Sequence, residues 1–274
     1  VKEFGINAKF YNPDSFDDLK DKVTKKTKML IVENPGSNTF EFQDLSKIIN
    51  LAKSKNILTF LDNTWGTPLY LKPLTIGFDM SFTSATKYFS GHSDAMGGSL
   101  AVNKKVFKKV MFFYKLSGYR MSADEAYLII RGLRTLDVRL NAHFENTKLV
   151  INFLKKQKKI KEVLYPHKIK SNNYKLWKKY YKGATGLFSV VIKSKKKSSV
   201  IKFVNSLELF GIGYSWGGFE SLVLLQNLKG ETKYTRIRKY FRFKKDEHIV
   251  RLHIGLEDPK DLIEDLRKAL TYIK

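Results

Sequence analysis

The sequence predicts an α/β fold, with a larger part built on a mostly parallel sheet and a smaller α+β part after it. In the first part, short and nearly continuous apolar runs alternate with segments of helical spacing. Strands of that kind are typical of parallel sheets that helices cover on both faces. The length of 274 residues is enough to bury a sizeable core in one large domain or two modest ones.

The elements of the first part are indicated by apolar runs and by capping residues. Ser15 precedes a segment of helical spacing and is a candidate N-cap. An Asn-Pro-Gly-Ser sequence at 34–37 predicts a turn. We expect helices over 15–23 and 42–53, and strands over 8–11, 29–32, 57–61, 78–82 and 99–102.

Helical spacing dominates from Val106 to about Lys158 and is broken around Gly118 and Gly132. This stretch is expected to connect a large domain, residues 1–135, to a smaller C-terminal domain, residues 136–274. In the smaller domain we expect strands over 187–192, 222–225 and 250–254, and helices over 200–209 and 259–272. This mixture predicts an α+β arrangement.

The net charge of +25 raises the question of nucleic-acid binding, because basic surfaces bind phosphates. Only nine of the 51 basic residues are Arg, however, and the Lys residues are scattered through nearly every segment. Phosphate and groove recognition favours Arg. We therefore expect no specific nucleic-acid partner and interpret the charge as a solvated surface.

Cysteine is absent from the chain, which excludes disulfides, a thiolate nucleophile and a thiolate metal site. His92 and Asp94 lie close together but lack a third ligand at usable spacing, so no metal site is expected. No apolar run reaches the length of about 18 residues that indicates a membrane span, and no signal-peptide pattern is visible. The expected location is the cytoplasm, with no membrane partner.

Polar residues at two strand ends point to a cofactor site. Ser84 and Thr86 come just before Lys87, after an apolar run, and their hydroxyls can donate to phosphate oxygens. Asp62 follows another apolar run, and ligands of parallel sheets lie beyond the carboxyl ends of the strands. A lysine that binds an aldehyde and a carboxylate for a pyridinium nitrogen are the pair that pyridoxal 5′-phosphate (PLP) requires.

Six motifs extend this pattern over nearly the whole chain. They are Asp-Asn-Thr-Trp at 62–65, Ser-Ala-Thr-Lys-Tyr at 84–88, Gly-His-Ser-Asp at 91–94, Gly-Leu-Arg-Thr-Leu at 132–136, Tyr-Ser-Trp-Gly-Gly at 214–218 and Ile-Val-Arg-Leu-His-Ile-Gly-Leu-Glu-Asp at 249–258. In identity and order they resemble the Cys/Met-metabolism family of PLP-dependent enzymes, and within it the cystathionine β-lyase branch. The resemblance implies the PLP-dependent transferase-like fold for the large domain.

The resemblance also implies which residues hold the cofactor. Lys87 is expected to bind PLP covalently and then to take the Cα proton of the substrate. Asp62 is expected to keep the ring nitrogen protonated, and Ser84 and Thr86 to donate to the phosphate. The structural alternatives are a surface lysine, a turn-forming aspartate and ordinary hydroxyls at a strand end.

Three further residues are expected to bind the substrate. Arg251 lies in an apolar strand, where a charge needs a partner or a ligand. An internal salt bridge would satisfy it, whereas the resemblance implies that it binds the substrate α-carboxylate together with Ser215. Trp216 is expected to shape the pocket. Ser37 is a candidate lining residue near the cofactor ring, or simply part of a turn.

The resemblance implies a carbon–sulfur lyase of methionine biosynthesis that cleaves L-cystathionine to homocysteine, pyruvate and ammonia. The γ-acting relatives typically carry Leu at the position of Trp216, which favours the β-lyase. A cystathionine γ-synthase, a γ-lyase or a cysteine desulfhydrase is the alternative on the same fold, and a basic nucleic-acid-binding protein is the non-enzyme alternative. By resemblance, a homotetramer or homodimer is expected.

The sequence at the start of the chain has the pattern of a helix end, with Gly5 as the cap. The chain is therefore expected to begin inside a domain. The family's glycine-containing phosphate loop and stacking aromatic residue are expected ahead of this point, so we expect these 274 residues alone to be weakly active or inactive.

Overall fold

The computed structural model of the chain describes residues 2–166, 171–226, 243–244 and 246–274. Within these residues, the first of two sheets has the strand order β1 (Met29–Glu33), β2 (Leu58–Asp62), β3 (Met80–Ser84) and β4 (Gly98–Val102). Strands β1, β2 and β3 are parallel, and β4 runs antiparallel to β3. The register pairs Glu33 with Asp62, so the carboxyl ends of β1 and β2 lie side by side.

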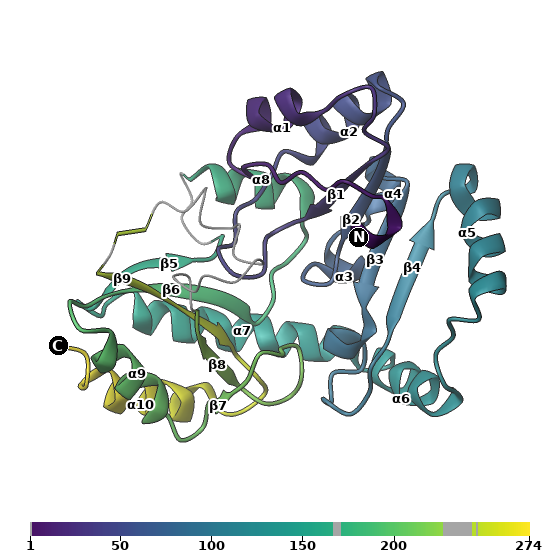
Figure 1. Cartoon of the computed structure of the whole chain (residues 1–274). Coiled ribbons are helices and arrows are strands. Elements are labelled where there is room, and N and C mark those ends of the chain that lie inside the picture. Colours follow the sequence, from purple (N-terminus) through teal and green to yellow (C-terminus); the bar gives the residue numbers. More distant parts are fainter. Residues whose placement is uncertain (1, 167–170, 227–242, 245) are drawn as a thin grey trace.

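Helices cover this sheet and connect its strands (Figure 1). Ser15 caps α1 (Phe16–Lys22) by accepting from the Asp18 N–H, as its position in the sequence predicts. The helix α2 (Leu45–Ser54) contacts β2 and buries residues spaced three and four apart, which is why an amphipathic helix forms there. The other helices of this part are η1 (Lys2–Phe4), α3 (Thr67–Tyr70), α4 (Pro73–Ile76), η2 (Ala85–Phe89), α5 (Lys104–Ser117) and α6 (Ala123–Leu133).

The second sheet has the strand order β5 (Ile160–Leu164), β6 (Leu187–Lys193), β9 (Glu247–His253), β8 (Leu222–Leu225) and β7 (Gly211–Ile212) among the described residues. Neighbouring strands are antiparallel except β7 and β8. The central strands β6 and β9 are buried almost throughout. The helices of this part are α9 (Lys197–Asn205) and α10 (Pro259–Leu270), side by side below the sheet in Figure 1, whereas α8 (Asn172–Tyr180) lies beside α2, where the Tyr180 hydroxyl accepts from the Ser46 N–H at 2.9 Å.

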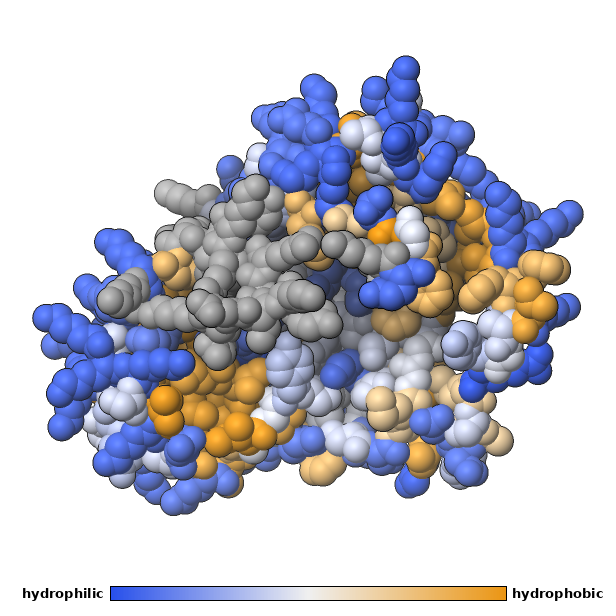
Figure 2. Space-filling view, viewed as in Figure 1, coloured by the Kyte–Doolittle hydropathy of each residue, from blue (hydrophilic) through white to orange (hydrophobic). Residues whose placement is uncertain are grey.

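The long helix α7 (Leu136–Leu154) joins the two parts. It contacts η2 beside the first sheet and β5 and α10 of the second. A single cluster of buried apolar side chains continues through both parts. Hydrophilic side chains cover much of the face shown in Figure 2, with apolar side chains exposed beside α5. Among the described residues, no helix is both long and apolar enough to cross a membrane.

Most of the expected elements form, with three kinds of difference. The segment 8–11 is not a strand, although its apolar alternation predicts one. The helix expected from residue 42 begins only at Leu45, because Asp44 caps it. The strands β5 and β7 and the helices α3, α4 and α8 were not expected; α8 has three Lys among nine residues, which obscures its apolar positions, α3 and α4 have four residues each, and β7 has two. The break at Gly118 is confirmed, since this residue caps α5 with a φ of 67°.

Candidate active site

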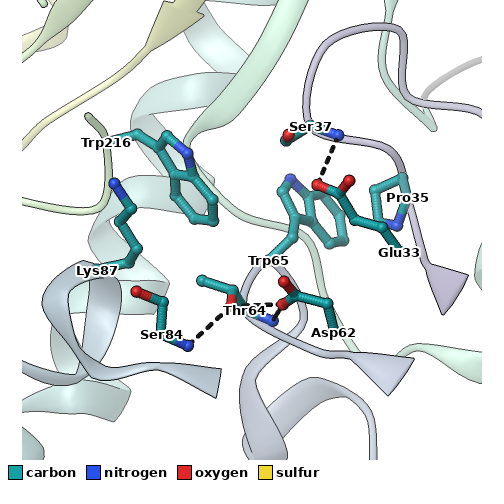
Figure 3. Close-up of a pocket in the computed structure, with 9 residues that line it drawn as sticks. All are labelled: Glu33, Pro35, Ser37, Asp62, Thr64, Trp65, Ser84, Lys87 and Trp216. Atoms are coloured by element: carbon teal, nitrogen blue, oxygen red, sulfur yellow. Dashed lines mark hydrogen bonds between the residues drawn. The ribbon is translucent and has the colours of Figure 1, made fainter. Parts of the chain in front are cut away.

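A cavity of about 120 Å³ lies at the carboxyl ends of β1, β2 and β3. Three of its lining residues, Glu33, Asp62 and Ser84, are the last residues of these strands. Lys87 and Trp216 lie on one side of the cavity and the two carboxylates on the other (Figure 3). Its walls consist of Glu33, Pro35, Ser37, Asp62, Thr64, Trp65, Ser84, Lys87 and Trp216.

Lys87 lies in η2, the turn that follows β3, and its amine extends toward the cavity (Figure 3). Its Nζ donates to Ser215 Oγ at 2.7 Å and lies 5.4 Å from the centre of the Trp216 ring. Burial lowers the pKa of Lys87, and the positive charge of Arg251 lowers it further. Both effects favour the uncharged amine, which is the form that acts as a nucleophile or base.

The turn that carries Lys87 is held in place by a buried arginine. Arg139, on α7, donates from Nη1 to Tyr88 O at 2.9 Å and from Nη2 to Gly132 O at 2.7 Å. The Gly91 N–H closes the turn by donating to Lys87 O at 2.9 Å. Arg139 thus connects the Lys87 turn and the end of α6 to α7 through backbone carbonyl groups.

The carboxylate of Asp62 belongs to a short chain of hydrogen bonds between β2 and β3. Its Oδ1 accepts from the Thr64 N–H at 2.9 Å and from the Thr64 hydroxyl at 2.6 Å. The Ser84 N–H in turn donates to Thr64 Oγ1 at 2.9 Å. These bonds fix the place of the Asp62 carboxylate beside Ser84 at the cavity wall.

Glu33 is a second carboxylate in the same cavity that sequence reasoning did not assign to the site. Its Oε1 accepts from the Ser37 N–H at 3.2 Å. Burial raises the pKa of Glu33, and the nearby charge of Asp62 raises it further. The signal available in the sequence was its position at the end of a strand that neighbours the Asp62 strand. Pro35, Thr64 and Trp65 were also not assigned, and they line the same cavity.

Arg251, on β9, is 3% exposed and does not line the cavity. Its guanidinium donates to Ser37 O at 3.3 Å, to Asn38 Oδ1 at 3.4 Å and to Tyr214 O. No carboxylate among the described residues forms a salt bridge with it, so the internal ion pair that sequence reasoning left open is not formed there. Burial lowers the pKa of Arg251. Because Ser37 lines the cavity, this contact places the Arg251 guanidinium close to the cavity wall at Ser37.

The remaining expected residues divide between the cavity and its surroundings. Ser84, Trp216 and Ser37 line the cavity directly. Ser215 adjoins it through its hydrogen bond with Lys87. Thr86 does not line the cavity: its hydroxyl accepts from the Gly97 N–H at 2.9 Å and lies 3.4 Å from Gly97 O. The structure thus brings Lys87 and Asp62 together, and turns the Thr86 hydroxyl toward β4.

The chemistry of the lining residues fits PLP. An amine with a lowered pKa extends toward the cavity from one side, which suits covalent attachment of an aldehyde. The carboxylate of Asp62, held by its hydrogen bonds with Thr64, lies on the other side, which suits a pyridine nitrogen. Ser84 supplies a hydroxyl for a phosphate oxygen at the cavity wall. No group of three or more potential metal ligands occurs in the part of the chain that the structure describes.

Comparisons with known proteins agree with this reading of the cavity. Residues 1–271 match the family described as "Cys/Met metabolism PLP-dependent enzyme". The chain is similar to an L-alanine/L-glutamate racemase of Wolbachia pipientis wMel, with 37% identity over 97% of this chain and 65% of the relative. It is also similar to a cystathionine beta-lyase of Bordetella avium, with 37% identity over 98% of this chain and 66% of the relative. The chain thus spans about two thirds of the length of these relatives.

Among solved structures, a cystathionine gamma-lyase from Lactobacillus plantarum complexed with L-serine superimposes with a TM-score of 0.89 and 25% identity. That match covers 99% of this chain and 71% of the other. The expected fold class, an α/β part with a mostly parallel sheet followed by a smaller α+β part, is confirmed. The match of the family over residues 1–271 and the identities above 30% lead to one conclusion. The chain belongs to the Cys/Met metabolism family of PLP-dependent enzymes.

Proposed function

We propose that this protein is a carbon–sulfur β-lyase that cleaves L-cystathionine to homocysteine, pyruvate and ammonia. The observation that carries the proposal is the placement of Trp216 beside Lys87 at the wall of the cavity, 5.4 Å from ring centre to Nζ. Several relatives with 32–37% identity are named cystathionine beta-lyase, including those of Bordetella avium and Salmonella typhimurium. Another relative, from Macaca fascicularis, is named cystathionine gamma-lyase, so the residues of the site have to distinguish the two reactions.

In the proposed reaction, PLP supplies an aldehyde that binds amines and a ring that accepts electrons from Cα. Lys87 takes the Cα proton, because its lowered pKa increases the fraction of uncharged amine at neutral pH. Ser215 orients that amine through its 2.7 Å hydrogen bond. The Asp62 carboxylate lies at the opposite side of the cavity, where it would pair with the ring nitrogen of the cofactor.

Trp216 is the residue that favours elimination at Cβ. Its indole is 8% exposed and packs edge to face on Tyr88 at 5.6 Å, so its orientation is fixed. A flat, immobile ring narrows the pocket and restricts the substrate side chain to conformations in which the bond from Cβ to sulfur can break. Arg251 and Ser215 are proposed to bind the α-carboxylate, and Ser84 and Thr86 the phosphate. Binding by Thr86 requires its hydroxyl to turn away from Gly97.

The test is analysis of the keto acid formed from L-cystathionine by the full-length protein loaded with PLP, since these 274 residues alone are expected to be weakly active or inactive. A β-lyase yields pyruvate, whereas γ-elimination yields 2-oxobutyrate. We expect pyruvate as the main product, and a lower rate of its formation in Trp216→Leu. Borohydride reduction should attach PLP to the peptide that contains Lys87, and Lys87→Ala should lower the rate by about 100-fold or more. Mainly 2-oxobutyrate would exclude the β-lyase, and PLP on another lysine would exclude the assigned site.

Racemisation is a second candidate function, favoured by the 37% identity to an L-alanine/L-glutamate racemase. Both reactions begin with removal of the Cα proton, which the same Lys87 can perform. They differ afterwards, because racemisation must return a proton to the opposite face of Cα. Incubation with L-alanine in D2O, followed by chiral separation, measures this activity directly. Deuterated D-alanine formed without pyruvate from L-cystathionine would favour the racemase over the lyase.

A further inference from the structure

A buried histidine lies directly behind the segment that carries Ser215 and Trp216. His253, the last residue of β9, is 1% exposed. Its Nε2 lies 3.0 Å from the Gly217 nitrogen and 3.1 Å from Gly218 O. Its Nδ1 is buried and has no hydrogen-bond partner among the residues described. Among the residues described, the ring therefore forms hydrogen bonds only through Nε2, and only with Gly217 and Gly218.

The same segment lies against the backbone that carries Lys87. A Cβ placed on Gly217 would lie 2.9 Å from Tyr88 N and 3.1 Å from Lys87 Cα, which is too close for any side chain. Gly217 also has a φ of 86°, which glycine adopts without strain. The backbone at 217 is thus packed on the turn at 87–88, and a small shift of one would move the other.

Other contacts hold the ends of this segment and the side chains of Ser215 and Trp216, whereas His253 contacts the backbone at its two glycines. Arg251 binds Tyr214 O before the segment, and the Leu256 N–H donates to Phe219 O at 2.8 Å after it. Between these two points lie Gly217 and Gly218, which have no side chains that could form stabilising contacts. His253 supplies the hydrogen bond at that position.

The orientation of the His253 ring is itself determined by packing. Tyr88 is fully buried and contacts the rings of His253 at 6.0 Å, His143 at 5.5 Å and Trp216 at 5.6 Å between ring centres. The His143 ring lies 5.2 Å from that of His253, and its Nδ1 is 2.8 Å from Ile254 O. The four rings form one buried cluster that extends from β9 to the Lys87 turn.

His253 is uncharged in this arrangement. Burial lowers its pKa well below the usual value, and the nearby His143, Arg251 and Lys87 lower it further. In one tautomer Nε2 accepts from the Gly217 N–H, and in the other it donates to Gly218 O. Either tautomer connects the same nitrogen to the same segment.

We infer that His253 is a positioning residue that holds the 215–218 segment in place through Nε2. By fixing residue 217 against the Lys87 turn, it sets the Ser215 hydroxyl opposite Lys87 Nζ and the Trp216 indole at the wall of the cavity. This inference rests on the proposed active site but does not depend on whether the reaction is elimination or racemisation. It gives a function to a buried histidine that takes no part in the proposed chemistry.

Two substitutions that introduce side chains of similar length distinguish the effect of the His253 hydrogen bond from the effect of its packing. In His253→Gln, the side-chain amide reaches the position of Nε2 and offers both an acceptor for Gly217 and a donor for Gly218. In His253→Met, a similar length of side chain fills the space with no comparable hydrogen-bonding group. His248 provides a matched control, because it is a buried histidine on the same strand whose Nε2 instead lies 3.1 Å from Ser194 O. His248→Met therefore perturbs β9 without touching the segment.

The measurements use the chain without added PLP, so they report on the protein alone. The chain has three Trp residues, and 5-fluorotryptophan labelling gives each a 19F signal, with Trp216→Phe identifying that of residue 216. We expect His253→Met to shift this signal toward its solvent-exposed value and to speed amide exchange at Gly217 by about tenfold, as loss of a buried hydrogen bond implies. His253→Gln should restore most of both values. His248→Met should leave both unchanged while lowering the melting temperature.

Two outcomes would overturn the inference. One is a Trp216 signal and a Gly217 exchange rate in His253→Met that equal those of the unmodified chain. The other is an equal change in His248→Met, which would indicate a general loosening of β9. If His253→Met does not fold, the 15N chemical shift of His253 Nε2 in the unmodified chain decides the question, because it reports a hydrogen bond in either tautomer: a value typical of an imidazole nitrogen without a hydrogen-bond partner would exclude the contact. Neither readout requires catalysis, so failure here is distinct from failure of the proposed reaction.

Discussion

The reactivity of Lys87 depends on a charge that comes from the other sheet. Arg251 lies on β9 and lowers the pKa of Lys87, adding to the larger effect of burial. Removing that charge in Arg251→Gln should therefore raise the pKa of Lys87 toward its usual value. The pH dependence of Lys87 labelling by an amine reagent, followed by mass spectrometry, measures the shift. Arg251→Lys keeps a positive charge and should leave the midpoint close to that of the unmodified protein; an equal shift in both variants would contradict the prediction.

His143 makes stability depend on pH in a defined direction. Burial lowers its pKa to about 4, whereas the unfolded chain has the usual value near 6.5. Between these values the unfolded chain binds a proton that the folded chain does not, so the free energy of unfolding falls as the pH falls from 6.5 to 4. The loss attributable to His143 reaches about 3 kcal/mol at most.

Urea unfolding at several pH values tests this prediction. His143→Asn cannot bind the proton, so its free energy of unfolding should decline less steeply between pH 6.5 and 4. The lowered pKa of His253 has the same effect, so the free energy of unfolding of the variant should still fall somewhat as the pH falls. Equal slopes in the variant and the unmodified chain would show that His143 is protonated in the folded state, or that it is exposed.

At the level of elements, the position of Lys87 depends on how closely α6 packs on η2. A Cβ on Gly132 would lie 2.2 Å from Ser90 O and 2.3 Å from Phe89 O, both of them backbone atoms. Gly132→Ala should therefore force α6 away from the turn and lower the free energy of unfolding by about 2 kcal/mol, although Ala favours helix. Arg131→Ala, on the exposed side of the same helix, should change it by less than about 0.5 kcal/mol. Chemical denaturation of both variants compares them, and equal stabilities would show that α6 moves freely.

Elements that consist of an apolar run were predicted well from the sequence. Elements that depend on contacts with other parts of the chain were predicted poorly. The strands at 29–32, 57–61 and 78–82 contain mostly apolar residues, and they form within two residues of the expected bounds. The segment 8–11 has similar residues but pairs with no strand among those described. A strand forms only when a neighbouring strand can pair with it, and the fold rather than the segment's own sequence determines whether one is there.

The site was partly predictable for the same reason. Asp62 and Ser84 were expected at strand ends, and parallel strands bring such ends together. The contact between Lys87 and Ser215 joins residues 128 positions apart, and no periodicity in the chain encodes it. The resemblance of the motif at 214–218 indicated Ser215 only as a residue that binds the substrate α-carboxylate, so its contact with Lys87 was not predicted. The chemical roles of these residues stay predictions, as does the division of the chain near residue 135.

At the level of the whole molecule, exposed apolar side chains on α5 point to self-association. Phe112 and Leu116 are 70% and 74% exposed, and Phe113 is exposed beside them. Exposed apolar surface of this kind is typical of interfaces. We propose that copies of the protein bind one another through this helix, in line with the expected dimer or tetramer.

Sedimentation velocity over a range of concentrations tests this proposal. The protein should sediment as an oligomer, and Phe112→Glu with Leu116→Glu should shift it toward the monomer. Lys108→Glu, an exposed position on the same helix, controls for the change of charge. An unmodified protein that stays monomeric at all concentrations would exclude the interface.

The cavity walls come from both sheets: Lys87 follows β3, and Trp216 lies between β7 and β8. A ligand that fills the cavity therefore binds only when both halves of the molecule are folded. Thermodynamic linkage then adds about 2.7 kcal/mol at a free ligand concentration 100 times Kd, and this free energy is lost when either half unfolds. The ligand thus couples the folding equilibria of the two halves. In calorimetry, the protein with ligand should therefore unfold in a sharper transition, closer to one single step, than the protein without ligand.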